Sequence, residues 1–556
     1  MIRFLLILII FLFSFDLNAQ TTWDGSTDTD WADSDNWSAG VPDASDAVTI
    51  PGSLSNYPSI DETANAASLT INSGGTVTIS KDGFLTVAGA ITNNGTLTVV
   101  SDANESGVLI AKAASNPSYT FTYYVHHDKW KLISPVVTGE IVNDIDNNLA
   151  TNSGKSAIGK YDGGDEEWDN YTTGSTSSLL TSKGYQIRYA SGSDGTVNFS
   201  GTMVNADRSR TLEDEGGSTY GRWHCIGNPF PSYIHLNDGA SSDNFIDDQS
   251  GLFASSYSAV YAWDGSAYDI YNNSSGAMKI APGEGFFIYI DADGGSATFT
   301  EASQTSGGGQ GFIGRGAKNK NSDYKNAGLK IKMTDSNTKS TRYTKIFFNN
   351  KSTLGLDEGY DAGAIGFYKD LNVYTRLIED DQGINMGIQS LPYSDMSDIV
   401  VPIGIDAKAG EIALVVQENT IPYDVQVYLE DKNTGKFTAF DEESNSIKIQ
   451  SSQDLSGTGR FFLHFNQEKI DESNIPSEIK IYAPLGERKV IVEGIKRFEE
   501  DPTFTLYNVK GEIIKQRILN KENGTETIMV DDLSGSVYIV NLNFNSIFIK
   551  KKIIIE

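Results

Sequence analysis

Oxygen-bearing side chains recur at alternate positions in two short segments of the sequence. They are Asp144 and Asp146 in the segment DIDN, and Asp291 and Asp293 in the segment DADG. Because Ca²⁺ takes about six to eight oxygen ligands from flexible loops, we predict these four residues as candidate ligands of a structural calcium ion. Neither segment completes an EF-hand loop, because the closing Glu is missing, and Asp and Asn also serve as turn formers. No other cofactor is expected.

Histidine and cysteine offer little chemistry. His126 and His127 are adjacent, but on a β-strand their side chains would face opposite sides, so we expect no shared metal ion there. Cys225 is the single cysteine, which excludes an intramolecular disulfide. Its apolar surroundings, WHCIG, predict a small buried hydrophobic residue rather than a nucleophile.

Catalytic motifs are missing from the sequence. Neither G-x-S-x-G nor H-E-x-x-H occurs, and the match to G-x-G-x-x-G at residues 309–314 lies in a Gly-rich stretch that no helix follows. Carboxylate pairs for glycoside hydrolysis cannot be singled out, since the separation that matters is three-dimensional. We therefore predict no catalytic residue and expect that the protein is not an enzyme.

Aromatic residues in turn-rich segments are the remaining candidates for ligand binding. They stand beside Asp, Asn and Gly, a combination that suits the faces and edges of sugars. Packing inside a repeated module is the alternative explanation. The candidates are Trp168, Tyr171, Trp263, Tyr268 and Tyr271.

The composition predicts an all-β protein of several domains. A length of 556 residues suggests three or four domains at about 150 residues each. Glycine is abundant, Tyr and Phe together number 52, and long helical periodicities are missing. The net charge of −30 disfavours a nucleic-acid partner, whose phosphates require Lys and Arg.

The N-terminus is predicted to be a cleaved signal peptide. Arg3 precedes the apolar run Phe4–Phe13, and Ala19 provides the small residue at the cut. The run is shorter than the ~20 residues of a membrane span, no Cys follows it for a lipid anchor, and we expect no transmembrane segment in the mature chain.

Residues 20–115 are predicted to form a short β-solenoid. Apolar residues alternate with Thr or Ser in strands separated by Gly-containing turns, at a spacing of about eight to twelve residues. Trp23, Trp31 and Trp37 precede these strands and are expected to cap the stack. This opening resembles the start of β-solenoid surface proteins that use type IX export.

Residues 116–305 contain an internal duplication, with repeats at about 130–204 and 223–302. Asp162-Gly163 matches Asp264-Gly265, Gly184-Tyr185 matches Gly285-Phe286, and the offset stays near 100 residues. Two similar copies are expected to pack as a pseudo-symmetric pair. A Gly-rich linker at residues 306–328 follows.

The rest of the chain consists of two further β domains. About eight strand-like runs in residues 329–465 predict a β-sandwich or jelly roll. Residues 479–556 give short β runs behind a polar linker, and they resemble the C-terminal sorting domain of type IX secretion. The matching positions include Gly511, Gly535, Tyr538, Lys551 and Lys552; Ser536 stands where that family usually has Gly.

This resemblance implies export through the periplasm to the outer-membrane surface or the medium, with the type IX machinery as partner. For the passenger, the exported chain that precedes the sorting domain, we predict a non-catalytic adhesion, matrix or glycan-contact protein. The alternatives are an extracellular polysaccharide hydrolase or accessory subunit, and a purely structural surface component.

Overall fold

The computed structural model describes most of the chain in two compact units. The described residues are 19–112, 116–127, 129–190, 192, 194–218, 220–307, 327–368, 370–423, 425–440, 446–466, 479–484, 486–497, 500–508, 513–544 and 547–555. One unit holds the chain up to residue 326 together with Leu356–Phe367, and the other holds Ala327–Gly355 and Tyr368–Glu556. The predicted signal peptide up to residue 18 and most of the predicted linker lie outside the described residues.

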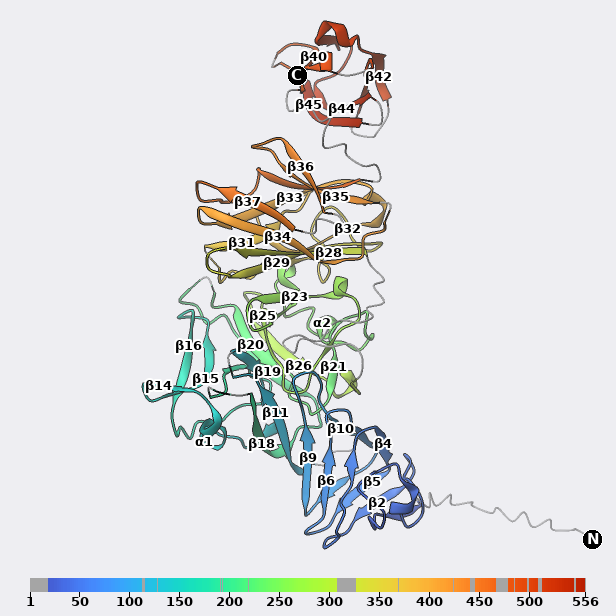
Figure 1. The fold of residues 1–556 in the computed structure, drawn as a ribbon, viewed down its shortest axis with the longest axis vertical. Helices are drawn as coiled ribbons and strands as arrows, with labels where there is room; N and C mark the ends of the chain where they lie inside the picture. The colour runs from blue at the N-terminus through green and yellow to red at the C-terminus, as the bar shows by residue number, and fades with distance from the viewer. Residues whose placement is uncertain are drawn as a thin grey trace, which may run out of the picture. The chain divides into compact units, whose positions relative to one another are not determined.

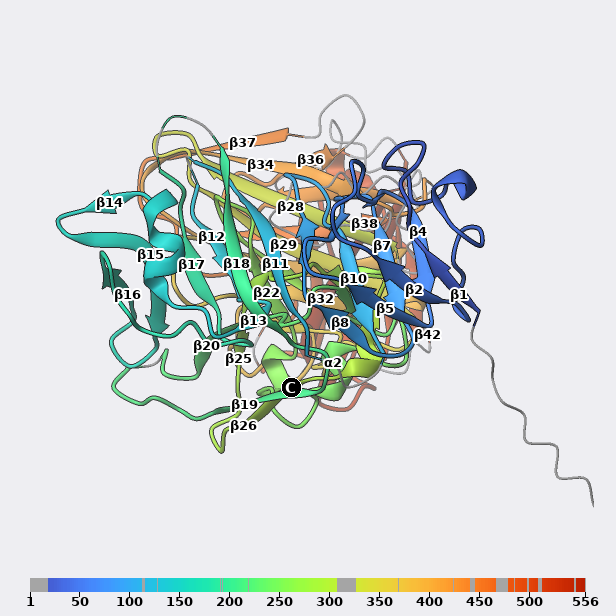
Figure 2. The ribbon, with the colours of Figure 1, turned by 90° about the horizontal axis from the view of Figure 1, so that it is seen from below.

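The first unit begins with a β-solenoid of three parallel sheets, as the sequence predicts (Figure 1). In most strands the apolar residues point inward and Thr or Ser points outward, which is the period of two that a pleated strand imposes. The strand Val108–Ala111 is buried along its whole length. Figure 2 shows the third sheet, with β4, β7 and β10 next to one another. The first sheet has β1 (Gln20–Thr22), β2 (Ala47–Ile50), β5 (Ser68–Ile71) and β8 (Ile91–Asn93); the second has β3 (Ser59–Ile60), β6 (Thr76–Ile79), β9 (Thr96–Val100) and β11 (Ser118–Val125); the third has β4 (Thr63–Ala66), β7 (Phe84–Val87) and β10 (Val108–Ala111).

The turns of the solenoid depend on glycine, because successive rungs stack backbone on backbone. A Cβ at Gly83 would lie 2.0 Å from the carbonyl oxygen of Ile60. The three tryptophans pack edge to face, with Trp37 5.0 Å from Trp23 and 4.7 Å from Trp31, and they are part of the solenoid core.

The duplicated segment contains the same strand order twice. Strand β11 pairs in parallel with β9 of the solenoid and antiparallel with β18. A single sheet therefore contains strands from both sides of the predicted boundary between the solenoid and the duplicated segment. In the first copy the pairing order is β12-β17-β15-β16, and in the second it is β20-β25-β22-β23. The first copy comprises β11, β12 (Lys131–Ile133), β13 (Val137–Thr138), α1 (Val142–Ile145), β14 (Thr151–Asn152), β15 (Lys155–Asp162), β16 (Glu167–Thr172), β17 (Tyr185–Ile187) and β18 (Gly195–Met203). The second comprises β19 (Arg208–Leu212), β20 (Trp223–Gly227), β21 (Tyr233–His235), α2 (Phe245–Asp248), β22 (Val260–Trp263), β23 (Tyr268–Tyr271), β24 (Lys279–Ile280), β25 (Gly285–Tyr289), β26 (Gly295–Phe299) and β27 (Gln304–Thr305).

The register also repeats between the copies. Lys131 pairs with Ile187 in the first copy, and His224 pairs with Ile288 at the equivalent place in the second. The antiparallel pair β11–β18 likewise has its counterpart in β19–β26. Each copy is therefore one sheet of four principal strands accompanied by one hairpin-like pair.

The second unit contains a long curled sheet around its own core. Its order is β36-β35-β38-β33-β31-β32-β29-β28-β34-β37, and the ends β36 and β37 come into contact, so the sheet nearly closes. The sheet is therefore barrel-like around one core, and a single sheet takes the place of the two that a sandwich would have. The strands are β28 (Ala327–Asp335), β29 (Thr341–Asn349), β31 (Leu371–Thr375), β32 (Met386–Pro392), β33 (Asp398–Ala407), β34 (Gly410–Asn419), β35 (Gln426–Asp431), β36 (Lys436–Phe440), β37 (Ser446–Ser451) and β38 (Phe461–Asn466).

The C-terminal segment forms a small two-sheet β domain with a separate core. One sheet contains β39 (Lys480–Tyr482), β40 (Lys489–Glu493) and β43 (Thr525–Met529); the other contains β42 (Ile513–Ile518), β41 (Thr503–Tyr507), β44 (Ser536–Phe544) and β45 (Ile547–Ile555). Among the described residues, no helix has the length and apolar character that crossing a bilayer requires.

Candidate functional site

The C-terminal β domain places most of the predicted sorting residues at one corner. Gly535 lies in the turn before β44, and the Tyr538 hydroxyl donates a 3.0 Å hydrogen bond to the carbonyl oxygen of Ser534, which closes that turn. Lys551 and Lys552 lie on β45 opposite Val540 and Ile539, with both lysine side chains exposed. Gly511 lies outside the described residues.

The predicted aromatic residues come together only in part. Trp168 and Tyr268 both pack against the buried ring of Phe287, at centroid distances of 5.8 and 5.6 Å, and Trp263 packs on Tyr268 at 5.0 Å. Tyr171 lies instead against Tyr185. Tyr271 packs against the core of the second copy and donates a hydrogen bond to Asp269.

The three residues around Phe287 belong to two equivalent cross-strand pairs. Tyr161 faces Trp168 across β15 and β16, and Trp263 faces Tyr268 across β22 and β23. The centroid separations are 5.5 and 5.0 Å. Each copy therefore contributes one aromatic pair, and the two pairs meet at Phe287.

A segment from elsewhere in the sequence completes this aromatic cluster. Phe367 lies 5.4 Å from Phe287, 5.6 Å from Tyr161 and 5.9 Å from Tyr268. Backbone atoms of the same segment accept hydrogen bonds from tyrosine hydroxyls: the Gly366 carbonyl from Tyr220 and the Gly363 carbonyl from Tyr261.

We name the junction cluster by its members: Tyr161, Trp168, Trp263, Tyr268, Phe287 and Phe367. Sequence reasoning missed three of them. Tyr161 and Phe287 could have been found by aligning the two copies around Asp162-Gly163 and Gly285-Phe286. No local pattern points to Phe367, which is about 80 residues from its nearest partner in the chain.

The four predicted calcium ligands do not converge. The buried Asp146 carboxylate accepts hydrogen bonds from the Ser156 hydroxyl at 3.2 Å and the Gly174 amide at 2.6 Å. Asp144 accepts from the Ile141 amide, and Asp291 accepts from the amide of Asp293. The contacts of Asp144 and Asp291 are local, as in turn-forming residues, whereas Asp146 connects segments that are distant in the sequence. Calcium binding at these positions stays a prediction.

The histidine pair is arranged differently from what strand alternation implied. Strand β11 ends at Val125, so His126 and His127 lie beyond the pleat and their rings stack at 5.0 Å with an interplanar angle of 10°. Their Nδ1 atoms both face Asp194, and that of His126 lies 3.5 Å from Asp194 Oδ1. The expectation that these side chains face opposite sides is wrong, because the strand ends before His126 and alternation no longer applies.

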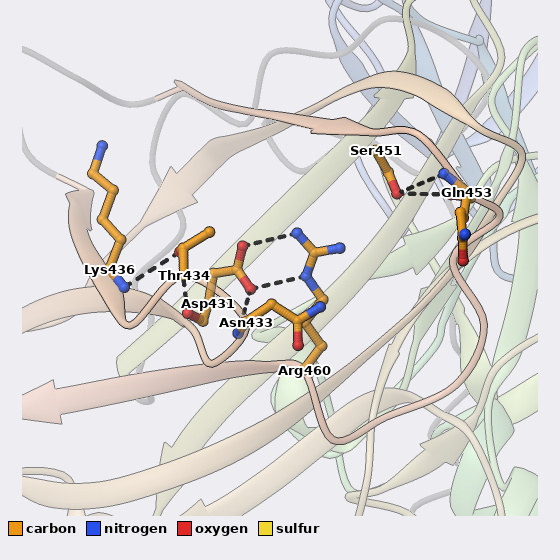
Figure 3. A network of polar contacts seen from close by, with 7 residues as sticks. All are labelled: Asp431, Asn433, Thr434, Lys436, Ser451, Gln453 and Arg460. Atoms are coloured by element: carbon orange, nitrogen blue, oxygen red, sulfur yellow. Dashed lines mark hydrogen bonds and ion pairs between the residues drawn. The ribbon is translucent and has the colours of Figure 1, made fainter. Parts of the chain in front are cut away.

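Other ionisable residues are buried or make contacts that stabilise the fold. Cys225 is buried, which raises the pKa of its thiol and keeps it protonated. In the curled sheet Asp431 and Arg460 form a bidentate pair with both N–O distances at 2.8 Å (Figure 3). The Asn433 amide also donates to Asp431, so this network fixes the turn between β35 and β36.

The fold and the C-terminal domain define the class of protein: a multidomain β protein with a dedicated export module. Residues 487–556 match the family described as "Secretion system C-terminal sorting domain", which confirms the predicted type IX sorting module. The protein is therefore secreted by the type IX machinery to the cell surface or the extracellular space.

Residues 22–465 match the family described as "Domain of unknown function (DUF8693)", and the chain belongs to this family. No curated protein matches the sequence. A solved structure described as "Biofilm associated protein - BSP domain" aligns with 10% identity over 77% of this chain and 90% of that chain, at a TM-score of 0.12.

Proposed function

We propose that the passenger is a non-catalytic surface or matrix protein that contacts extracellular glycans through the junction cluster. The observation that carries this proposal is the half-buried state of Trp168, Trp263 and Tyr268. Each ring is held by packing against other rings while part of its surface stays accessible.

Such rings are suited to binding because their orientation is already set. An aromatic ring that is immobilised before binding loses little conformational entropy when a ligand stacks on it. A sugar presents apolar C–H faces to the ring and hydroxyl groups to polar neighbours.

A carbohydrate-binding assay tests the proposal. The mature chain and the variant Trp168→Ala/Tyr268→Ala are applied to a polysaccharide array, with the matched control Tyr171→Ala, a half-buried aromatic outside the junction cluster. We expect binding that the double variant loses and the control keeps. Equal binding by all three proteins would place the glycan contact elsewhere, and no binding by the intact chain would leave the purely structural role.

An extracellular hydrolase is the second candidate, and one carboxyl group favours it. Burial raises the pKa of Glu140 to about 7, a value typical of a general acid. However, Glu140 is only 1% exposed and accepts a 2.7 Å hydrogen bond from the Ser200 amide, which supports a structural use. We expect no release of reducing ends when the chain is incubated with polysaccharides, and release that Glu140→Gln abolishes would reverse this assignment.

A further inference from the structure

The end of the hairpin-like pair β11–β18 gathers three side chains with metal-binding chemistry. His126 and His127 follow β11, and Asp194 directly precedes β18. One ligand atom from each residue lies within 4.8 Å of the others. Side-chain exposures of 40%, 26% and 33% leave the three groups accessible to an ion from solvent.

We propose that His126, His127 and Asp194 bind a divalent transition metal such as Zn²⁺. The ion would take Nδ1 of each imidazole and Oδ1 of the carboxylate, and water would complete the shell. Two imidazoles with one carboxylate suit Zn²⁺, Ni²⁺ or Cu²⁺, whereas Ca²⁺ and Mg²⁺ prefer oxygen ligands alone. Ligand atoms that each lie about 2.1 Å from a tetrahedral ion are ~3.4 Å apart. His126 Nδ1 and Asp194 Oδ1 already have this spacing, at 3.5 Å, whereas His127 Nδ1 must move away from Asp194 Oδ1 to admit the ion.

The carboxylate is oriented by a hydroxyl group and a backbone amide, neither of which would bind the metal. The Tyr124 hydroxyl donates to Asp194 Oδ2, and the His127 backbone amide donates to Oδ1 at 3.0 Å. Both hydrogen bonds fix the orientation of the carboxylate. Support of this kind orients a ligand and strengthens a metal site.

The second copy of the module provides a natural comparison. The pair Val125–Gly195 closes β11–β18, and the pair Leu212–Gly295 closes β19–β26 in the same way. Beyond it the second copy has Glu213 and Asp214 in place of the histidines and Gly294 in place of Asp194. Only the first copy therefore has this combination of two imidazoles and a carboxylate. A metal there would link the end of β11 to the start of β18.

Zn²⁺ titration of the mature full-length chain by calorimetry tests the site. We expect one ion per chain, a large loss of affinity in His126→Ala/His127→Ala, and a loss of about tenfold in Tyr124→Phe, which removes only the supporting hydrogen bond. The control Asp61→Asn alters an exposed acidic cluster at Asp30, Asp61 and Glu62, and should bind as the unmodified chain does.

A second measurement does not depend on any variant. In the chain labelled with ¹⁵N-histidine, which has five histidines, Zn²⁺ should shift the ring signals of His126 and His127 alone. Unchanged binding in the histidine double variant, displacement by equal Ca²⁺, or the absence of Zn²⁺ binding would each overturn the proposal.

Discussion

The two copies of the duplicated module share a framework and differ in the side chains that it carries. Ile133 of the first copy forms a bridge with Glu284 of the second, and the equivalent Ile226 forms one with Lys183, the counterpart of Glu284. The glycines that follow are reciprocal as well: a Cβ at Gly184 would lie 2.8 Å from the Cys225 carbonyl carbon, and one at Gly285 would lie 2.6 Å from the Ile133 amide nitrogen. The copies therefore meet about a pseudo-twofold axis through backbone contacts.

The side chains at the equivalent positions have diverged. Lys131 and Glu284 form a buried ion pair at 3.4 Å, whereas their counterparts are His224 and Lys183. Phe287 joins the junction cluster, but its counterpart Gln186 donates a hydrogen bond to Asn170 instead. The comparison shows that the backbone contacts between the copies are the same on both sides, whereas the side chains around them differ and make different interactions in each copy.

The ion pair at the junction gives the largest expected effect. Lys131→Met leaves the Glu284 charge buried without its cation, and we expect the free energy of unfolding to fall by about 3–5 kcal/mol. Tryptophan fluorescence during denaturant unfolding measures this selectively, because all seven tryptophans belong to the first unit. Lys131→Met/Glu284→Leu should recover much of the loss, and Lys160→Met, at an exposed pair with Asp169, should cost less than about 1 kcal/mol.

The reciprocal glycines test the symmetry directly. Gly184→Ala and Gly285→Ala force a methyl group into the backbone of the other copy, and each should lower the free energy of unfolding by about 2–3 kcal/mol. Gly251→Ala is the matched control, since a Cβ there meets nothing within 4 Å. A strong effect at only one of the two glycines would break the proposed equivalence of the two sides.

The segment that contains Phe367 is bound mainly to the second copy, because its backbone accepts hydrogen bonds from Tyr220 and Tyr261. Substitution of Phe367 tests whether this segment supports one copy more than the other. Phe367→Ala should cost about 2 kcal/mol, less than a fully buried ring, because Phe367 is half-buried. Hydrogen exchange should show the loss of protection mainly in β22 and β25. Equal loss in β15 and β17 would mean that the segment supports both copies alike.

Glu140 sharpens the comparison through pH. It precedes α1 and is buried, whereas Asp243 at the matching place before α2 is exposed. Burial raises the pKa of Glu140 from 4.5 to about 7. Between these values the unfolded chain releases its proton first, so the contribution of Glu140 to stability falls as the pH rises.

Glu140→Gln removes this dependence, and at pH 8 we expect a gain of at most about 3 kcal/mol over the unmodified chain, the free-energy equivalent of a pKa raised from 4.5 to about 7. At pH 4 the two chains should unfold alike. Denaturant unfolding at the two pH values measures the difference, with Asp243→Asn as control. A variant that is less stable at pH 8 would show that the Ser200 hydrogen bond to the carboxylate outweighs its burial.

The sequence by itself determined the elements, their repetition and the route of export. Alternating Thr and apolar residues define the faces of each solenoid strand, because a pleated backbone has a period of two. Matched positions such as Asp162-Gly163 and Asp264-Gly265 share an offset near 100 residues, which indicated the duplication. The positions around Tyr538 identified the sorting domain. These patterns are local, and backbone geometry alone relates them to structure.

Only the tertiary structure decided which side chains meet. His127 and Asp194 are 67 residues apart, and Trp263 bonds to the Trp130 carbonyl across 133 residues. Phe367 reaches the junction cluster from beyond a predicted linker. Sequence periodicity assigns a side chain to a face of its own element, whereas the partner across that face depends on how distant elements pack.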